Sequence, residues 1–259
     1  MSTFALEKWY FDTVTPEGRT FIGYSAELKL FGLKVPYAQS LVCGYDQKPE
    51  LKNGFRKHEK PIVNAHNITC NTGLFQVDAE RTQKKDIKER LYDDGKQHLI
   101  WHCLETNTNV SVHFCNKAEL QGRGYVEKLS MTIKPWMLPI NELWWGRFTG
   151  KRHSVVWIHW EHALPQSWLF INGQKQSEAK ISREIISSTG MRLAISHQKT
   201  LIDAKPFREH TRLLGFILPA SMRHMHEQKW LATGLLNLDG EEDHGFLIHE
   251  RVSFKNIAQ

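Results

Sequence analysis

Apolar and polar side chains alternate with a period of two along much of this chain. The clearest case is the stretch 19–31, where one predicted face carries Ile22, Tyr24, Ala26, Leu28 and Leu30. The opposite face carries Gly23, Ser25, Glu27 and Lys29. Because neighbouring side chains of a strand point to opposite faces, this pattern predicts a half-buried strand whose second face is polar.

Other stretches show the same period or are rich in β-branched and aromatic residues, and turn signals such as "YDDG" at 92–95 separate them. They predict strands at 7–14, 35–43, 62–70, 73–79, 98–105, 108–115, 123–133, 154–161, 168–172, 191–197, 211–218, 229–238 and 245–254. The stretch 81–91 fits a short helix, but its "KERL" fits the start of a strand equally well. Many short strands with few helices indicate an all-β fold of antiparallel strands in a sandwich or barrel.

The length of 259 residues suits two domains of about 100–150 residues each. The density of predicted strands is similar in both halves, and neither an exact repeat nor a low-complexity linker is visible. We therefore expect two β domains, 1–120 and 121–259, with the boundary just before "GRGYVEKL".

The net charge of +6 and the pI near 9.1 would suit binding to nucleic acid or to an anionic membrane. However, the densest basic region, 81–90, is interleaved with acids, so we expect no nucleic-acid partner. The four cysteines form no C-x-x-C pair, the first residues lack a signal-peptide pattern, and no apolar run could span a membrane. These features predict a reduced, cytoplasmic protein without stable membrane insertion, and they carry no information on its oligomeric state.

Three carboxylates interrupt otherwise apolar rows of the predicted strands. Glu127 shares a row with Tyr125 and Leu129, and Glu250 falls between Ile248 and Val252. Glu7 shares a row with Trp9 and Phe11. Burial raises the pKa of a carboxyl group, as general acid catalysis near neutral pH requires. The alternative is a structural ion pair, for which Arg123, Arg147 and Arg251 are available.

The region 135–162 is the richest in aromatic residues. It contains Trp144, Trp145, Trp157 and Trp160 in close order. In the strand 154–161, Trp157 and His159 share one face and Ile158 and Trp160 the other. This arrangement fits an apolar pocket with one polar group, and it fits the core of a large β-structure equally well.

Histidines at 224 and 226 have the spacing of a chelating pair, but no glutamate follows at the distance that a cupin-type metal site needs. The chain contains no H-E-x-x-H, G-x-S-x-G, Walker A or G-x-G-x-x-G motif. We expect no metal and no cofactor, which leaves acid–base chemistry or simple binding; a metal-dependent enzyme that uses His224 and His226 is the weaker alternative.

Six short motifs occur in a recognisable order: "EKWYFD", "GRTFIGYSAEL", "GRGYVEKL", "LWWGRF", "VVWIHW" and "GFLIHERV". In these motifs the chain resembles the lipocalin-like superfamily of hydroxyneurosporene synthase, tocopherol cyclase and the lipocalin-like Diels–Alderases. The resemblance implies two calycin β-barrel domains packed together, with a hydrophobic pocket within or between them. It also implies cyclisation, hydration or cycloaddition of terpenoid or polyketide substrates without a redox cofactor.

The function predicted from these features is a cofactor-independent cyclase, isomerase or hydratase that acts on a hydrophobic small molecule. The predicted catalytic residues are Glu127, His159 and Glu250. The predicted substrate-binding residues are Trp144, Trp145, Trp157, Trp160, Tyr125 and Trp9. The alternative is a non-catalytic carrier or sensor of lipid-like molecules, because the same barrel and pocket would suffice for binding.

Overall fold

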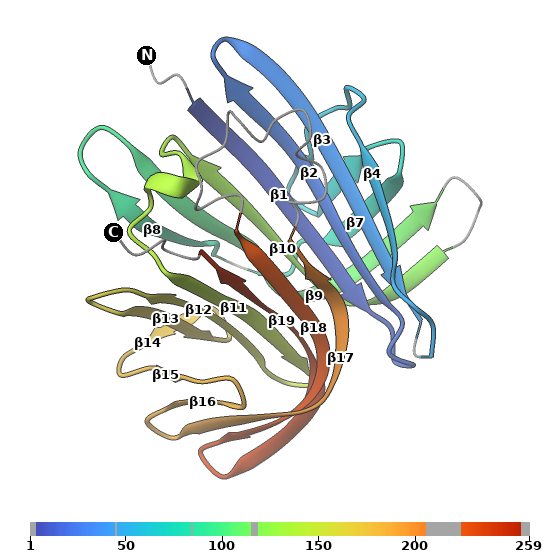
Figure 1. Ribbon diagram of the computed structural model, residues 1–259. Coiled ribbons are helices and arrows are strands. Elements are labelled where there is room, and N and C mark those ends of the chain that lie inside the picture. Colours follow the sequence, from blue (N-terminus) through green and yellow to red (C-terminus); the bar gives the residue numbers. More distant parts are fainter. Residues whose placement is uncertain (1–3, 45, 84, 115–118, 206–223, 255–259) are drawn as a thin grey trace. The chain divides into compact units, whose positions relative to one another are not determined.

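The computed structural model describes residues 4–44, 46–83, 85–114, 119–205 and 224–254, which form two compact units, Met1–Pro135 and Trp136–Gln259 (Figure 1). The predicted all-β fold is confirmed: the described residues form antiparallel strands and one 3₁₀ turn, and none of them lies in an α-helix. None of the described segments is a helix long and apolar enough to cross a bilayer.

The strands of unit 1 are β1 (Phe4–Val14), β2 (Thr20–Leu30), β3 (Leu33–Cys43), β4 (Glu50–Gly54), β5 (Ile62–Val63), β6 (Asn67–Asn71), β7 (Phe75–Glu80), β8 (Ile87–Asp93), β9 (His98–Phe114) and β10 (Glu119–Met131). The 3₁₀ turn η1 (Pro135–Met137) follows. The strands of unit 2 are β11 (Glu142–Gly150), β12 (Ser154–Glu161), β13 (Gln166–Ile171), β14 (Gln174–Gln176), β15 (Lys180–Ile181), β16 (Ile185–Ser188), β17 (Met191–Ala204), β18 (His226–Leu238) and β19 (Glu241–Ser253).

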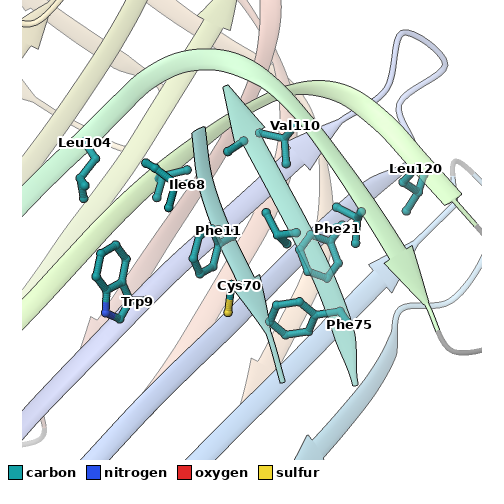
Figure 2. Packing of buried hydrophobic residues seen from close by; sticks show 13 residues of the cluster. Trp9, Phe11, Phe21, Ile68, Cys70, Phe75, Leu104, Val110 and Leu120 are labelled. Atoms are coloured by element: carbon teal, nitrogen blue, oxygen red, sulfur yellow. The ribbon is translucent and has the colours of Figure 1, made fainter. Parts of the chain in front are cut away.

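Unit 1 is one sheet in the order β4-β3-β2-β1-β10-β9-β7-β6-β5, and β8 also pairs with β9. The sheet curls so that β6 and β7 face β1 and β2 across a hydrophobic cluster (Figure 2). That cluster contains Trp9, Phe11, Phe21, Ile68, Cys70, Phe75, Val77, Ala79, Leu104, Val110, Val112, Leu120 and Val126. We call the side of the sheet that carries this cluster the inner face of unit 1.

The inner face corrects the prediction of a half-buried strand at 19–31. Residues 20–26 are buried on both faces, because Phe21, Gly23 and Ser25 face the inner cluster. Phe21 meets Phe75 edge to face at 5.1 Å between ring centroids. A Cβ atom on Gly23 would lie 2.5 Å from the Phe21 ring and 2.9 Å from the Phe75 ring, so this position needs glycine.

Unit 2 is one sheet in the order β14-β13-β12-β11-β19-β18-β17-β16-β15. Its hydrophobic cluster contains Phe148, Val155, Trp157, Leu169, Ile171, Ile186, Met191, Leu193, Ile195, Ala232, Leu236 and Leu247. Read strand by strand, this order matches that of unit 1: β11 takes the place of β1, β12 that of β2 and β19 that of β10. The two units therefore repeat one topology, although no exact repeat is visible in the sequence.

The domain boundary differs from the predicted position between residues 120 and 121. That position falls inside β10, whose residues pair with β1 on one side and with β9 on the other. Cutting there would remove the strand that joins the two halves of the unit 1 sheet. The division lies instead between Pro135 and Trp136.

We next compare further predictions of helices and strands with the structure. The stretch 81–91 holds the start of β8, so its strand alternative is confirmed and its helical alternative is wrong. The predicted strands 98–105 and 108–115 are one strand, β9. The predicted strand 211–218 lies outside the described residues. Among elements that the alternation did not reveal, β11 matters most, because its residues 145–150 are buried on both faces and show no period of two.

Candidate active site

A cavity of about 410 Å³ opens on the inner face of unit 1. Strands β1 and β2, the start of β3 and the loop 55–61 between β4 and β5 line it. The predicted binding residue Trp9 is part of its wall. The structure adds Ser25 and His58 to that wall, two residues that the sequence did not indicate.

Ser25 and His58 form a hydrogen-bonded pair inside this cavity. Ser25 Oγ lies 2.9 Å from His58 Nε2, and His58 Nδ1 lies 3.1 Å from the backbone carbonyl of Arg56. A carbonyl only accepts, so in the neutral ring Nδ1 carries the proton and Nε2 accepts from the Ser25 hydroxyl. This is the arrangement of a general base held in one tautomer beside a hydroxyl.

Cys70 lies beneath Ser25 but is not a nucleophile. Burial raises the pKa of its thiol to about 12, and the hydrogen bond with Ser25, which acts in the opposite direction, does not offset this. A thiol with this pKa holds its proton at neutral pH, whereas the thiolate is the reactive form. Cys70 therefore adds no reactive thiolate to the hydroxyl of Ser25 and the imidazole of His58.

Glu7, one of the three unexpected carboxylates, is explained by ion pairs at the rim of the cavity. Its Oε1 lies 3.0 Å from Lys60 Nζ, and its Oε2 lies 3.0 Å from Lys128 Nζ. Burial alone would raise the pKa of Glu7, but the hydrogen bonds and charges of Lys128 and Lys60 outweigh it and lower the pKa. Glu7 is thus an ionised partner that ties the loop 55–61 to β1, and not a proton donor.

Trp9 carries a polar group without a partner. The side chain is 7% exposed, and its indole Nε1 is buried and has no hydrogen-bond acceptor. Lys128 lies over the ring, with Nζ 5.3 Å from the centroid. Because an unsatisfied buried N–H is costly, this donor beside an open cavity is a feature that a bound acceptor would resolve.

Glu127, the first predicted catalytic residue, lies on the other face of the unit 1 sheet. It is the register partner of Tyr10, not of Trp9, and it is 9% exposed. Its Oε2 accepts a hydrogen bond of 2.6 Å from the hydroxyl of Tyr125 and another from the indole N–H of Trp101. Tyr125 and Glu127 therefore share one face, as the sequence predicted. Burial keeps the pKa of the Tyr125 hydroxyl well above its usual value.

Two of the three arginines considered as partners of the unexpected carboxylates, Arg123 and Arg251, are engaged with other groups. Arg123 donates to Asn107 and Asn109. Arg251 donates to Glu142 through Nε, at 2.9 Å from Oε2, and through Nη2. The partner of Glu250 is a lysine: Lys229 Nζ lies 2.6 Å from its Oε2, and Lys229 is fully buried.

His159 and Glu250 are not brought together. His159 pairs in register with Trp144, whereas Glu250 pairs with the next residue, Trp145, so their side chains leave opposite faces of the unit 2 sheet. His159 contacts Ser167 Oγ through Nδ1 at 2.8 Å and Glu161 Oε2 through Nε2 at 3.2 Å.

The predicted tryptophans divide between the two faces in the same way. Trp157 belongs to the hydrophobic cluster, and its prediction to share a face with His159 agrees with their register. Trp145 and Trp160 are buried on the opposite face, where the Trp160 ring meets Trp168 at 5.5 Å. Trp144 is half-buried under the guanidinium of Arg251, whose Cζ is 5.3 Å from the ring centroid.

The histidine pair of the metal hypothesis has a simpler contact. His226 Nε2 lies 2.5 Å from Asp203 Oδ1. Across the part of the chain that the structure describes, no three His, Cys, Asp or Glu side chains gather as metal ligands.

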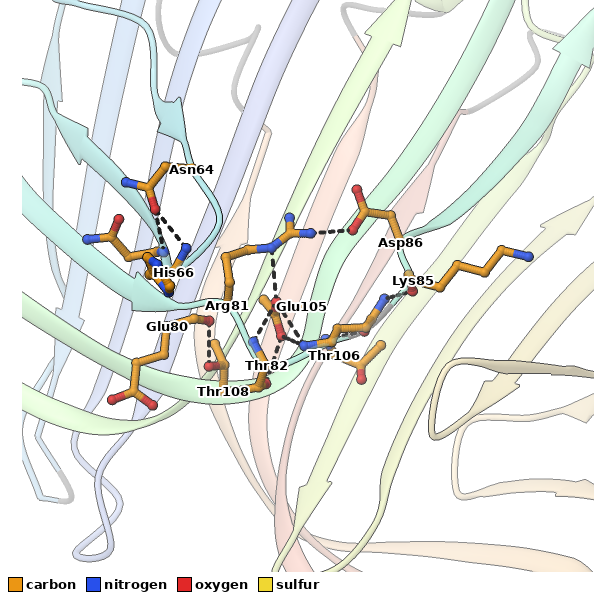
Figure 3. A network of polar contacts seen from close by, with 12 residues as sticks. Asn64, His66, Glu80, Arg81, Thr82, Lys85, Asp86, Glu105, Thr106 and Thr108 are labelled. Carbon is orange, nitrogen blue, oxygen red and sulfur yellow. Dashed lines mark hydrogen bonds and ion pairs between the residues drawn. The ribbon is translucent and has the colours of Figure 1, made fainter.

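A buried carboxylate that the sequence did not indicate is Glu105 of β9, which is structural (Figure 3). It accepts hydrogen bonds from the backbone N–H groups of Thr82 and Gln83, and Arg81 Nε lies 3.5 Å from it. Burial raises the pKa of Glu105 against these hydrogen bonds, which lower it. Its polar partners all belong to the loop 81–83, so it fastens this loop to β9.

Comparisons of sequence return no match, either to a family model or to a curated protein. Comparisons of structure do. CghA in complex with Sch210972 is similar over 98% of this chain and 89% of its own, with a TM-score of 0.58 and 10% identity. CghA alone has a TM-score of 0.57 at 10% identity, over 100% of this chain and 91% of its own.

Kievitone hydratase from Nectria haematococca has a TM-score of 0.54 at 8% identity, over 97% of this chain and 90% of its own. At these identities the likeness concerns the fold and carries no residue role. It confirms the architecture that the sequence motifs implied: this chain has the two-unit lipocalin-like fold shared by CghA and kievitone hydratase.

Proposed function

We propose that this protein is a non-redox enzyme that carries out acid–base chemistry on a mainly apolar small molecule, and that the cavity of unit 1 is its binding site. The observation that carries the proposal is the Ser25–His58 pair, at 2.9 Å, beside the unsatisfied N–H of Trp9 in one cavity. A base and a hydroxyl lie there, beside a tryptophan with an unsatisfied donor, in the wall of a space large enough for a small ligand.

Each of these groups has a role in the proposal. His58 accepts a proton from the substrate, either directly or through the Ser25 hydroxyl, and returns it to another atom of the substrate. The Arg56 carbonyl keeps the ring in the tautomer that can do so. Proton transfer by a positioned side chain contributes about 10²–10⁴-fold to a rate.

The fold supports this class of chemistry by analogy. One protein of similar structure is named a hydratase, and addition or removal of water is acid–base chemistry that needs no electron transfer. A terpenoid or polyketide substrate, as the sequence motifs suggest, is the finer part of this proposal.

The sequence-based assignment of Glu127, His159 and Glu250 as catalytic residues is a separate proposal. Glu127 lies on the face opposite the cavity, so it does not contact a molecule bound against Trp9. Both assignments predict the same class of reaction, and single substitutions distinguish them.

The test is untargeted mass spectrometry of an apolar extract of the host, incubated with the native protein, with His58→Gln and with Glu127→Gln. The proposal expects a compound to be converted to an isomer, or to a species that differs by one water, by the native protein and by Glu127→Gln but not by His58→Gln. If compounds are retained unchanged and equally by all three proteins, the chain is a carrier and the enzyme proposal is wrong.

A further inference from the structure

The matched topology of the two units extends to individual residues at one end of their central strands. Glu-x-Trp occurs at 7–9 in β1 and again at 142–144 in β11. Glu-Lys-Leu-Ser at 127–130 in β10 corresponds to Glu-Arg-Val-Ser at 250–253 in β19. The matched strands of the two units therefore carry the same types of side chain at these positions.

The registers of these strand pairs are identical. In unit 1, Trp9 pairs with Lys128 and Glu7 with Ser130. In unit 2, Trp144 pairs with Arg251 and Glu142 with Ser253. The cation of the last strand lies over the indole in both units, at 5.3 Å from the ring centroid in each. The chain thus contains two copies of one arrangement, which can be compared directly.

In unit 2 the indole N–H has an acceptor within the arrangement, and we call this copy closed. The indole N–H of Trp144 donates to Glu142 Oε2 at 3.2 Å, and Arg251 binds the same carboxylate through two nitrogens. The hydrogen bonds of Arg251 and Trp144, together with one from Ser253, offset the burial of Glu142 and lower its pKa. Trp144, Arg251 and Ser253 thus all donate to the one carboxylate of Glu142.

In unit 1 the indole N–H has no acceptor within the same arrangement, and we call this copy open. Glu7 is drawn between Lys128 and Lys60, both at 3.0 Å, and the Trp9 indole N–H is left without an acceptor. Lys60, which forms one of the two ion pairs with Glu7, lies in the loop that also carries His58. This copy borders the cavity whose wall holds the hydrogen-bonded pair of Ser25 and His58, whereas the unit 2 copy borders a cavity of about 480 Å³ that His224 and His226 line.

The charges around the open copy indicate what would fill it. The cavity is lined by three carboxylates, Glu7, Glu27 and Glu59, and by three lysines, Lys34, Lys57 and Lys60, and Lys128 over the Trp9 ring adds a fourth cation. Lys60 and Lys128 already share Glu7. Two lysines share one carboxylate here, so an electron-rich oxygen of a ligand would be stabilised beside them.

We infer that the cavity of unit 1 binds a mainly apolar molecule through an oxygen atom that accepts a hydrogen bond from Trp9 Nε1. This oxygen takes the place that the carboxylate of Glu142 holds against Trp144 in unit 2. The inference rests on the proposed function, because it uses the same cavity, and it adds the polarity of the ligand and the atom that recognises it.

The experiment compares two probes of the same shape, 2-acetylnaphthalene and its hydrocarbon analogue 2-isopropenylnaphthalene, which carries CH₂ in place of the carbonyl oxygen. Binding is measured by titration calorimetry, and the Trp9 N–H is followed by its ¹⁵N indole resonance, identified from its loss in Trp9→Phe. We expect the native protein to bind the ketone about threefold to tenfold more tightly, the range that one net hydrogen bond contributes. The Trp9 indole proton should move downfield with the ketone alone, while the Trp144 resonance stays in place.

The preference should disappear in Trp9→Phe and persist in Trp144→Phe, which is the matched change in unit 2. Equal binding of both probes to the native protein, or a preference that survives in Trp9→Phe, would overturn the inference and leave the cavity as a binding site. If neither probe binds, the cavity itself fails, and the proposed function falls with the inference.

Discussion

The carboxylate of Glu7 lies 3.0 Å from Lys60 Nζ, whereas the carboxylate of Glu142 at the matched position of unit 2 accepts the N–H of its own tryptophan, Trp144. One lysine in a loop therefore separates an open site from a closed one. The ion pair is largely exposed, so its contribution to stability is small, about 0–1 kcal/mol. Its effect on the position of Glu7 is the more important one.

Lys60→Met tests this relationship. Without Lys60, Glu7 keeps Lys128 at Oε2, and its Oε1 loses its partner and can accept the Trp9 N–H, as Glu142 accepts that of Trp144. We expect the Trp9 indole proton to move downfield in the absence of ligand and the affinity for 2-acetylnaphthalene to fall about threefold to tenfold. Lys57→Met is the control, because Lys57 lines the same cavity and its loss removes the same charge. An equal effect of both substitutions would assign the change to charge and not to Glu7.

His58→Gln should reduce turnover about 10²–10⁴-fold, because it removes the proposed base while a similar volume remains. The melting temperature should change little, since His58 is half-exposed in a loop. Ligand affinity should stay within a few fold, measured on the compound that the extract identifies. His66→Gln, an exposed histidine outside the cavity, controls for loss of an imidazole. Unchanged turnover in His58→Gln would remove His58 from the mechanism.

Glu127→Gln separates the two assignments of catalysis. Gln retains one acceptor for Tyr125 and Trp101 but brings two N–H donors into a buried site. We expect a loss of about 1–3 kcal/mol in the free energy of unfolding, with turnover retained. The opposite result, a loss of turnover at an unchanged melting temperature, would place the chemistry at Glu127.

Lys229→Met should be strongly destabilising. It removes a fully buried ammonium that lies 2.6 Å from Glu250 and 3.6 Å from Glu227, and it takes this cation away from two partly buried carboxylates. Breaking one partner of a buried ion pair costs about 3–5 kcal/mol, to be measured by denaturant unfolding. The double variant Lys229→Met with Glu250→Gln should recover part of this loss. Additive effects of the two changes would mean that the pair is not coupled.

His249 predicts a dependence of stability on pH. Burial lowers its pKa from 6.5 to about 4, the charge of Arg183 adds to this, and Glu250 opposes it. The unfolded chain therefore binds a proton that the folded chain excludes between these values. This contribution is fully present above pH 6.5 and is lost as the pH falls toward 4, by up to about 3 kcal/mol.

The measurement is the free energy of unfolding of the native protein and of His249→Phe between pH 4 and 7.5. His249 is 2% exposed and stacks on Trp230 at 5.0 Å, so phenylalanine preserves the ring contact. The free energy of unfolding of the native protein should fall relative to that of His249→Phe as the pH is lowered from 6.5 to 4, and the difference should be constant above pH 6.5. Parallel curves across the whole range would show that His249 titrates alike in both states.

The element types followed from the sequence alone. The alternation at 19–31 and the similar stretches predicted antiparallel strands, because the period of two in side-chain direction is a local property of the backbone. The unusual positions of Glu7, Glu127 and Glu250 within apolar rows were also visible locally, and all three carboxylates are engaged by hydrogen bonds or ion pairs. The motif "EKWYFD" lies in β1 and contains Glu7 and Trp9, and the motif "GFLIHERV" lies in β19 and contains Arg251. Each motif thus contributes residues to one of the two matched clusters.

Only the tertiary structure decided which face of each strand is inward, which partners the carboxylates have and where the cavity lies. Ser25 appeared to be on a polar, solvent-facing row, yet it is 2% exposed, because the curl of the sheet brings β6 over it. His58 lies in a loop without any periodicity, 33 positions from Ser25 along the chain. Registers and loop positions depend on contacts between distant segments, and a single strand pattern carries no information about them. For the same reason the matched copies at Trp9 and Trp144 became visible only when the strands were paired.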